Sequence, residues 1–321
     1  MSLYHIKHIT KYTYSDNVVD GTNQIRLYPL NNEFQKVISQ HIVISGNPNV
    51  HTYKDFFNNT IGVFMRIEPH NYLSIISDIE IITHPVVFPK DTAKPSEQWE
   101  VLKSLKLDTQ FLDYLKCIAF NGTSEISQIL LGKDKLTPYK LAIELCEYVY
   151  TNFTYIQGIT NVHSKLDEVW QLKAGVCQDF TNVLLQMVRM AGIPARYVSG
   201  YICPSDSKTR GEGATHAWIE VYIPYYGWLG LDPTNNIIVS EHHVKLAVGR
   251  NYKDCAPVNG VYKGDVTDSL FVKVHVSTTK TDREISISSS DAEKSKPIKR
   301  EGSKNSYREN LAFIQQQQQQ Q

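Results

Sequence analysis

The chain reads Gly175-Val176-Cys177-Gln178-Asp179-Phe180 at the point where a glycine-containing turn enters a helix. Apolar residues recur on one face of this helix through Ala191, and Gly192-Ile193-Pro194 ends it. Unpaired backbone N–H groups and the helix dipole favour an anion at a helix N-terminus. Cys177 is therefore predicted to be a reactive thiol rather than a buried hydrophobic side chain.

Three short strands are predicted after this helix, at Arg196 to Cys203, Thr215 to Ile223 and Gly227 to Asp232. Each segment is rich in aromatic and β-branched residues. The last two are joined by the turn Pro224-Tyr225-Tyr226, so they should pair as antiparallel neighbours. A helix followed by such strands indicates an α+β domain.

His216 stands at the start of the second strand, on its polar and aromatic face. A helix terminus stabilises an anion by at most ~2 kcal/mol, so a thiolate at Cys177 needs a cationic partner, which an imidazolium can supply. Antiparallel pairing would bring Asp232 next to the start of the His216 strand. A carboxylate there could fix the imidazole tautomer and stabilise its charged form. Cys177, His216 and Asp232 are thus predicted to be a catalytic triad.

Other residues could complete the site. The backbone N–H of Cys177 is expected to bind an oxyanion, with Tyr155 or Gln178 as the second donor. The ordinary alternatives are a core tyrosine and a solvated residue in the first helical turn. Aromatic residues on strands also more often belong to the core. Three candidates to line a substrate cleft are Trp218, Trp228 and Asp179.

Composition limits the class of protein. Lys plus Arg and Asp plus Glu number 33 each, so no net field favours nucleic acid or an anionic membrane. The five cysteines include no C-x-x-C pair and are odd in number, which suits thiols in a reducing compartment. No secretory signal or run of 18 apolar residues is present, so a cytoplasmic location is expected. The sequence indicates no cofactor and leaves the oligomeric state open.

Four segments are expected along the chain. The first is rich in β-branched residues separated by turns, as in an antiparallel β-sandwich, and prolines at 85, 89 and 95 precede a helical pattern. A late strand, Leu270 to Val276, is expected to return to the first sheet, and the Ser- and Lys-rich end finishes in seven glutamines. The predicted boundaries are a β-sandwich domain at 1–88, a catalytic domain at 89–264, C-terminal strands returning to the β domain at 265–287, and a disordered low-complexity tail at 288–321.

The chain order Cys, His, Asp across a helix and following strands is that of papain-like folds. The segments that carry a closer resemblance are Gly175 to Phe180, Gly192 to Tyr201, His216 to Trp218, Asp232 to Asn235 and Ala247 to Pro257. They resemble the bacterial transglutaminase-like superfamily. The β-rich N-terminal half is also similar to the N-terminal domain of these proteins, so the resemblance covers about residues 1 to 280.

This resemblance implies a papain-like, transglutaminase-like α+β core preceded by the antiparallel β-sandwich, with Cys177, His216 and Asp232 as the triad. Asn251 stands where an acidic residue would be expected, outside the triad. The expected activity is hydrolysis of a peptide or protein amide through a thioester on Cys177. Transfer of the acyl group to an amine by the same three residues is the alternative reaction.

Two classes without this chemistry remain open. The first is a non-catalytic binding module that retains the fold, which an inert Cys177 would indicate. The second treats Cys177, His216 and Asp232 as zinc ligands. The chain has neither a C-x-x-C nor an H-E-x-x-H motif, so the spacing of these residues does not favour zinc.

Overall fold

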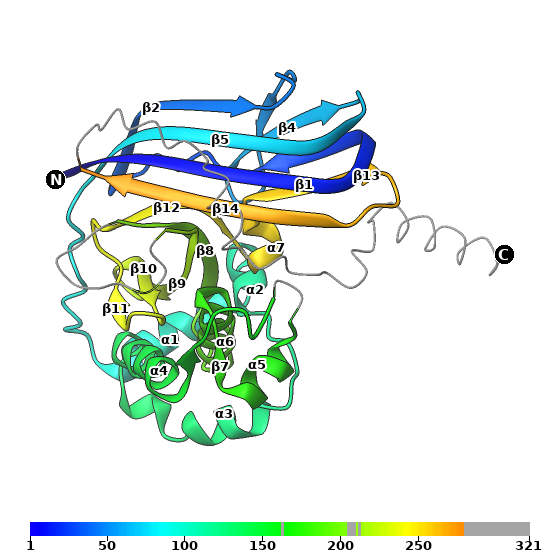
Figure 1. Ribbon diagram of the computed structural model, residues 1–321. Coiled ribbons are helices and arrows are strands. Elements are labelled where there is room, and N and C mark those ends of the chain that lie inside the picture. The colour runs from blue at the N-terminus through cyan, green and yellow to red at the C-terminus, as the bar shows by residue number, and fades with distance from the viewer. Residues whose placement is uncertain (162–163, 204–209, 211–212, 279–321) are drawn as a thin grey trace. The chain divides into compact units, whose positions relative to one another are not determined.

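The computed structural model describes residues 1–161, 164–203, 210 and 213–278 of the chain (Figure 1). These residues form two compact units. A β unit comprises 2–30, 36–82 and the chain from Ala256, while a helical unit comprises 83–255 with Asn31–Gln35 and Met1. The expected disordered tail, 288–321, and residues 279–287 of the expected C-terminal strands lie outside the described residues. Within those residues, no helix has the length and apolar composition needed to span a bilayer.

The β unit is built around one long strand, β1, whose two edges are both occupied by partners. The strand order is β2-β5-β1-β4-β3, and two strands from later in the chain, β13 and β14, also pair with β1 (Figure 1). The strands are β1 (Ser2–Ile25), β2 (Gln35–Ile44), β3 (His51–Lys54), β4 (Thr60–Arg66), β5 (His70–Thr83), β13 (Val258–Lys263) and β14 (Asp268–Ser277).

Non-local pairing joins residues 258–277 to the first strand of the chain in this sheet. β14 runs antiparallel to β1 from the pair His5 and Ser277 to the pair Tyr14 and Asp268. β13 pairs with the end of β1, across an irregularity between Val19 and Thr22. Alternate residues of β5 from Leu73 to Ile81 are buried, as expected for a strand with one face on a core. The late strand thus pairs with the first strand of the chain.

The helical unit combines helices with a five-stranded antiparallel sheet of order β11-β10-β9-β8-β12. The helices are α1 (Pro95–Leu105), α2 (Thr109–Leu115), α3 (Thr123–Ile129), α4 (Pro138–Asn152), α5 (Leu166–Leu172), α6 (Cys177–Met190) and α7 (Tyr252–Cys255), with a 3-10 turn η1 (Lys133–Lys135). The strands are β6 (Thr154–Tyr155), β7 (Ala174–Gly175), β8 (Ala195–Ile202), β9 (His216–Ile223), β10 (Gly227–Asp232), β11 (Ile237–Ile238) and β12 (His243–Gly249). The α+β class predicted from the sequence is confirmed.

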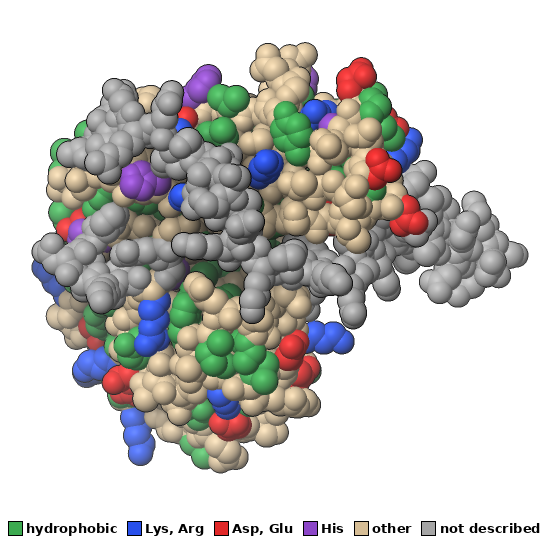
Figure 2. Space-filling model, in the orientation of Figure 1, with side chains coloured by type: hydrophobic (Ala, Val, Ile, Leu, Met, Phe, Trp, Pro, Cys, Tyr) green, Lys and Arg blue, Asp and Glu red, His purple; other side chains and the backbone are tan. Residues whose placement is uncertain are grey.

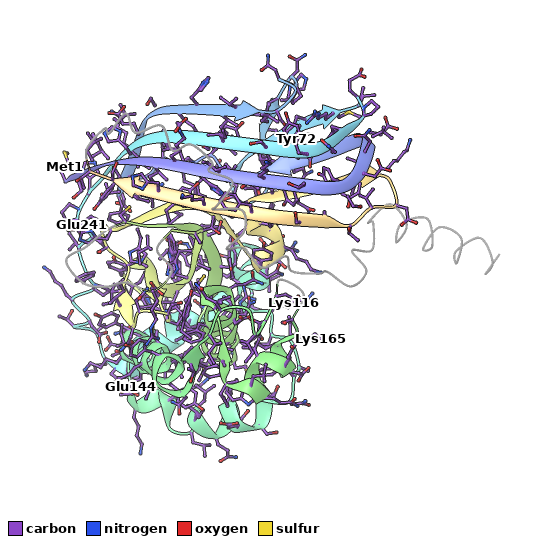
Figure 3. All side chains as sticks on the ribbon, viewed as in Figure 1. Met1, Tyr72, Lys116, Glu144, Lys165 and Glu241 are labelled. Carbon is purple, nitrogen blue, oxygen red and sulfur yellow. The ribbon has the colours of Figure 1, made fainter. Side chains whose placement is uncertain are left out.

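Local sequence explains where α4 and α6 begin. Thr137 caps α4 by accepting a hydrogen bond from the backbone N–H of Lys140, and Pro138 follows as the first helical residue. Glu144 lies on the exposed side of α4, where it is labelled in Figure 3. α6 is buried along nearly its whole length and ends before Gly192, whose φ of +87° suits glycine. Both predicted helices are confirmed.

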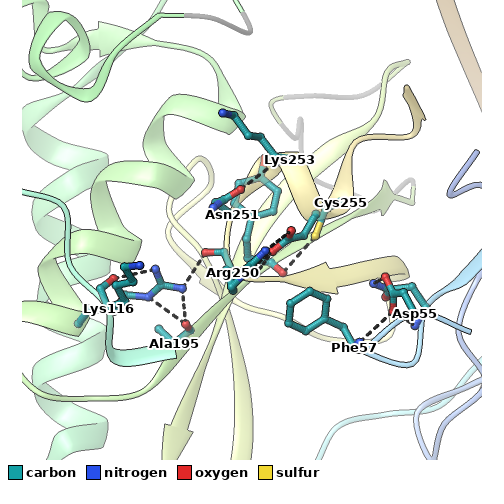
Figure 4. Close-up of polar contacts among 12 residues, drawn as sticks. Asp55, Phe57, Lys116, Ala195, Arg250, Asn251, Lys253 and Cys255 are labelled. Atoms are coloured by element: carbon teal, nitrogen blue, oxygen red, sulfur yellow. Dashed lines mark hydrogen bonds and ion pairs between the residues drawn. The ribbon is translucent and has the colours of Figure 1, made fainter. Parts of the chain in front are cut away.

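One buried guanidinium holds α6 against the polypeptide that surrounds it. Arg189 donates hydrogen bonds to the carbonyl oxygens of Ala195, Lys116 and Arg250, at 2.7 to 3.2 Å (Figure 4). Burial lowers the pKa of Arg189 to about 10. A hydrogen bond to a charged group is worth roughly 1.5–3 kcal/mol, so this side chain fixes the C-terminal end of α6 relative to β8.

Charged side chains do not gather by sign on the face shown in Figure 2. Lys and Arg side chains are interspersed there with those of Asp and Glu. The arrangement agrees with the equal totals of the two kinds in the sequence.

Candidate active site

Cys177 is the first residue of α6 and is presented by a short strand pair. β6 runs parallel to β7, with Thr154 opposite Ala174 and Tyr155 opposite Gly175. Val176 is extended, with φ of −114°, and the helix starts at the next residue. Cys177 is half-buried, and its Sγ lies 4.0 Å from the carbonyl oxygen of Thr215, the residue before β9. The thiol therefore stands at a helix N-terminus, beside the strand that begins with His216.

Asp179 locks the turn that carries the thiol. It is 3% exposed, and its Oδ2 accepts hydrogen bonds from the Val176 backbone N–H at 2.8 Å and the Thr160 hydroxyl at 2.6 Å. Burial raises the pKa of Asp179, although both hydrogen bonds oppose that change. The structure thus gives this predicted cleft residue buried contacts that hold the start of α6.

Gly175→Ala should disturb the same turn. A Cβ at this position would lie 2.5 Å from Oδ2 and 2.7 Å from Cβ of Asp179, closer than real Cβ atoms approach. We expect a loss of ~1–3 kcal/mol in the free energy of unfolding, measured by urea denaturation. Gly21→Ala is a strand control, because its nearest heavy atom would be 3.6 Å away, an ordinary contact. Equal losses in the two variants would contradict the steric explanation.

His216 and Asp232 form a buried hydrogen-bonded pair. Strands β9 and β10 pair antiparallel, from Ile223 opposite Gly227 to Ile219 opposite Leu231. His216 Nε2 lies 2.8 Å from Asp232 Oδ2, and neither side chain is exposed. His216 Nδ1 is buried and makes no protein hydrogen bond of standard geometry with the described residues. With Nε2 committed to Asp232, Nδ1 is the nitrogen left to interact with Cys177.

Five donors surround the Asp232 carboxylate. Oδ1 accepts from the backbone N–H groups of Thr234 and Asn235, at 2.9 and 3.4 Å. Oδ2 accepts from His216 and from the Asn235 side-chain amide, each at 2.8 Å, and from His243 Nε2 at 3.4 Å. A carboxylate held by several donors remains ionised even when buried. Asp232 is therefore a fixed negative charge.

The opposite charges of His216 and Asp232 determine which of the two groups carries the proton. Burial by itself lowers the pKa of His216, but the charge and hydrogen bond of Asp232, with the interaction of Cys177, outweigh burial and raise it to about 10. Burial by itself raises the pKa of Asp232, but His216 and His243 outweigh that effect and hold it well below its usual range. His216 is thus an imidazolium at neutral pH.

The remaining predicted residues have different surroundings. Tyr155 lies beside the Cys177 turn, and burial, followed by the charge of Cys177, raises the pKa of its hydroxyl, which therefore stays a donor. Gln178 is the half-buried second residue of α6. Trp218 is fully buried, with ring centroids 6.3 Å from His216 and 5.3 Å from His243. The structure brings it to the triad.

Trp228 belongs to a separate aromatic cluster in the same unit. Its ring centroid lies 5.3 Å from that of Tyr114, 5.6 Å from Tyr222 and 6.1 Å from Phe111. The Arg196 guanidinium lies over it, 4.3 Å from the ring centroid. Phe111 and Tyr114 belong to α2, so the position of Trp228 is explained by packing against that helix.

His243 is the residue of the site that sequence reasoning missed. Its neighbours in sequence are polar, yet His243 begins β12 and its side chain is fully buried. β12 pairs with β8, with His243 opposite Ile202. β8 and β12 are far apart in sequence, and no local motif predicts that they pair. The contact between His243 and Asp232 could therefore not be predicted from the sequence.

The donor types also invite a comparison with metal sites. Among the described residues, one group of histidine and carboxylate atoms lies within 4.8 Å of one another, from His216, Asp232 and His243, and it does not include Cys177. Oδ2 of Asp232, the oxygen in this group, already accepts hydrogen bonds from the Asn235 amide and from His216 Nε2, each at 2.8 Å. Such donors fit a hydrogen-bonded carboxylate better than a zinc ligand.

The chain matches two known families in sequence. The transglutaminase-like superfamily matches residues 130–233, and the bacterial transglutaminase-like N-terminal region matches residues 4–82. An uncharacterized protein of Mycobacterium leprae, ML0607, is 31% identical over 281 residues, 84% of this chain and 97% of that protein. An uncharacterized Mycobacterium tuberculosis protein, Rv2569c, is 32% identical over 290 residues, 85% of this chain and 92% of that protein.

Two further similarities are more distant. The protein-glutamine gamma-glutamyltransferase of Pseudomonas aeruginosa is 33% identical over 76 residues, 22% of this chain and 11% of that protein. The crystal structure of a candidate cysteine protease from Cytophaga hutchinsonii shares the fold with a TM-score of 0.69 at 20% identity, covering 88% of this chain and 92% of that one. The chain belongs to the transglutaminase-like superfamily, with the bacterial N-terminal region of that family.

Proposed function

We propose that the chain is a cysteine-dependent amide hydrolase, a protease or peptidase, with Cys177 as nucleophile, His216 as acid and base, and Asp232 as the group that orients His216. Membership of the superfamily supports a cysteine-dependent enzyme in general. The observation that carries the proposal is the buried 2.8 Å pair of His216 and Asp232 beside a half-exposed thiol at a helix N-terminus.

The reaction follows from these positions. The Cys177 thiolate attacks the amide carbonyl carbon, a C–S bond forms, and the C–N bond breaks as His216 gives its proton to the departing amine. The product of this step is a thioester. Neutral His216 then takes a proton from water, the hydroxide adds to the thioester carbonyl, and the acid leaves as the C–S bond breaks. His216 and Cys177 return to their starting protonation.

Two donors suit the oxyanion of the tetrahedral intermediate. The backbone N–H of Cys177 belongs to the first helical turn, where N–H groups lack an intrahelical acceptor. The Tyr155 hydroxyl is favoured as the second donor over Gln178, because β6 holds Tyr155 beside the turn and its proton is retained. Tyr155→Phe, which removes only the hydroxyl, should slow acyl-enzyme formation about 100- to 1,000-fold in stopped-flow kinetics. An unchanged rate would assign the second donor elsewhere.

Transfer of the acyl group to an amine is a second candidate reaction. It is favoured by the local similarity to the protein-glutamine gamma-glutamyltransferase, which spans 22% of this chain. Both reactions form the same thioester on Cys177 and differ in the molecule that resolves it. The proposed substrate in either case is an amide of a peptide or protein.

Mass spectrometry of the intact protein distinguishes these outcomes. The protein is exposed to peptide libraries with and without an added primary amine. An adduct on Cys177 followed by a cleaved, unmodified peptide supports hydrolysis, while an amine-capped product supports transfer. A protein that forms no adduct and whose Cys177 reacts with iodoacetamide no faster than a free thiol would be a binding module rather than an enzyme.

A further inference from the structure

A second imidazole binds the carboxylate that orients His216. His243 Nε2 lies 3.4 Å from Asp232 Oδ2, the same oxygen that lies 2.8 Å from His216 Nε2. All three side chains are completely buried. All three belong to one sheet: His216 begins β9, Asp232 ends the adjacent β10, and His243 begins β12, which β8 separates from β9. The geometry therefore joins the two histidines through one oxygen atom.

His243 is a neutral donor in this arrangement. Burial lowers the pKa of His243, and electrostatic interactions with His216 and His242 lower it further, against the opposing effect of Asp232. A neutral imidazole carries one N–H, and an ionised carboxylate can only accept. The proton of His243 is thus assigned to Nε2. Its Nδ1 is buried and has no hydrogen-bond partner among the described residues.

We propose that His243 is a positioning residue for His216, a role that rests on the proposed amide hydrolysis: its Nε2–H takes part of the charge of Asp232, so that His216 can release its proton to the departing amine. Asp232 must hold the imidazole in place without binding the proton too tightly. A carboxylate that accepts fewer hydrogen bonds is a stronger base. It would hold the proton of His216 more tightly and slow its release to the amine.

The hydrogen bond from His243 to Asp232 matters because it affects how readily His216 releases its proton. A general acid works best when its pKa is near the working pH. Asp232 and Cys177 already raise the pKa of His216 to about 10, despite its burial. A further rise would make His216 a slower acid in the step that breaks the C–N bond. Cleavage of an amide needs this proton because an amine anion is a poor leaving group. Hydrolysis of an activated ester does not need it, because its leaving group departs as a stable anion.

Other titratable groups near the three residues come from several elements. Cys177 acts on His216, Tyr155 and Cys146 interact with the charge of Asp232, and Arg210 acts on Tyr155. Burial raises the pKa values of Tyr155 and Cys146, so both are uncharged near neutral pH. His242 acts on His243 from the adjacent position. A titration of His216 is therefore simplest in a Cys177→Ala background, with His242 tested separately.

The experiment is an NMR titration of the full chain labelled with ¹⁵N-histidine, in the Cys177→Ala background. The His216 ring signal is identified by its loss in His216→Gln. His243→Leu removes the donor, whereas His243→Gln places an amide N–H near the position of Nε2. We expect His243→Leu to raise the His216 midpoint by about one pH unit and His243→Gln to change it by less than about half of that. His242→Gln is the matched control and should leave the midpoint unchanged.

The result would overturn the proposal if His243→Leu left the midpoint unchanged or lowered it, or if His243→Gln moved it as far as His243→Leu. His243→Met, also apolar, replaces His243→Leu if the latter lacks a dispersed spectrum. With the thiol intact, loss of the donor should slow cleavage of a peptide p-nitroanilide about tenfold more than hydrolysis of p-nitrophenyl acetate. Equal slowing would indicate a structural role. A wild-type protein that cleaves no anilide would count against the proposed function, while the titration would still test His243.

Discussion

Replacing Cys177 by serine is expected to lower the rate of covalent adduct formation at neutral pH by at least about a thousandfold. A hydroxyl occupies nearly the same volume as a thiol but is a far weaker nucleophile in a pair with an imidazolium. The His216–Asp232 pair does not involve the substituted atom, so the fold should be retained. Intact mass spectrometry after a short exposure to iodoacetamide measures the fast-reacting thiol. Circular dichroism checks that the variant is folded.

Cys117→Ser is the matched control for this measurement. Cys117 is also accessible, but it lies outside the site and its Sγ is 3.6 Å from the carbonyl oxygen of Leu115. Partial burial of the sulfur raises the pKa of Cys117, so its thiol should react slowly at neutral pH. The remaining thiols, Cys146, Cys203 and Cys255, are buried. Fast labelling that persists in Cys177→Ser, or that disappears in Cys117→Ser, would assign the reactive thiol to another residue.

The parts of the site that depend on local signals could be predicted from the sequence. The start of α6 follows from Gly175 and Cys177, and its end from Gly192. The β9–β10 pairing follows from a short turn, which fixes the register of two adjacent segments and brings Asp232 to His216. In each case the information lies within about twenty residues of sequence.

The parts that depend on long-range packing could not be predicted. His243 reaches Asp232 because β12 pairs with β8, and the register of that pair includes an irregularity between Lys245 and Ala247. A shift of one residue would turn His243 to the other face of the sheet, and no sequence pattern excludes such a shift. Trp228 likewise shares β10 with Asp232, but its place is set by side chains of α2.

Asp232→Asn should have an effect as large as the loss of the thiol, through the charge of His216. Without the carboxylate, burial is no longer opposed and the pKa of His216 should fall from about 10 to below 6.5, so that the imidazole is neutral at pH 7. An asparagine amide that donates to Nε2 also forces the proton onto Nδ1, the nitrogen that must accept the proton of Cys177. We expect adduct formation to fall about 10³- to 10⁴-fold, measured as a rate against pH.

Stability should change with pH in a way that a simple packing defect would not reproduce. In the wild type, the raised pKa of His216 contributes stability fully below pH 6.5, and this contribution is lost as pH rises through about 10. The lowered pKa of Asp232 contributes above the unfolded value of ~3.9 and is lost in acid. The difference in free energy of unfolding between wild type and Asp232→Asn should therefore narrow from pH 6.5 to 10, measured by urea denaturation.

Asp254→Asn provides the charge-matched control, because Asp254 pairs with Arg250 on the segment after β12. This variant removes the same charge as Asp232→Asn, but at a residue outside the triad. It should therefore leave the rate of adduct formation and its pH dependence unchanged. A pH-independent stability difference for Asp232→Asn would mean that Asp232 acts only as a hydrogen-bonded core residue. Asn keeps the shape of Asp, loses its charge and gains an amide donor in both variants, so the contrast between them isolates the effect of Asp232 on His216.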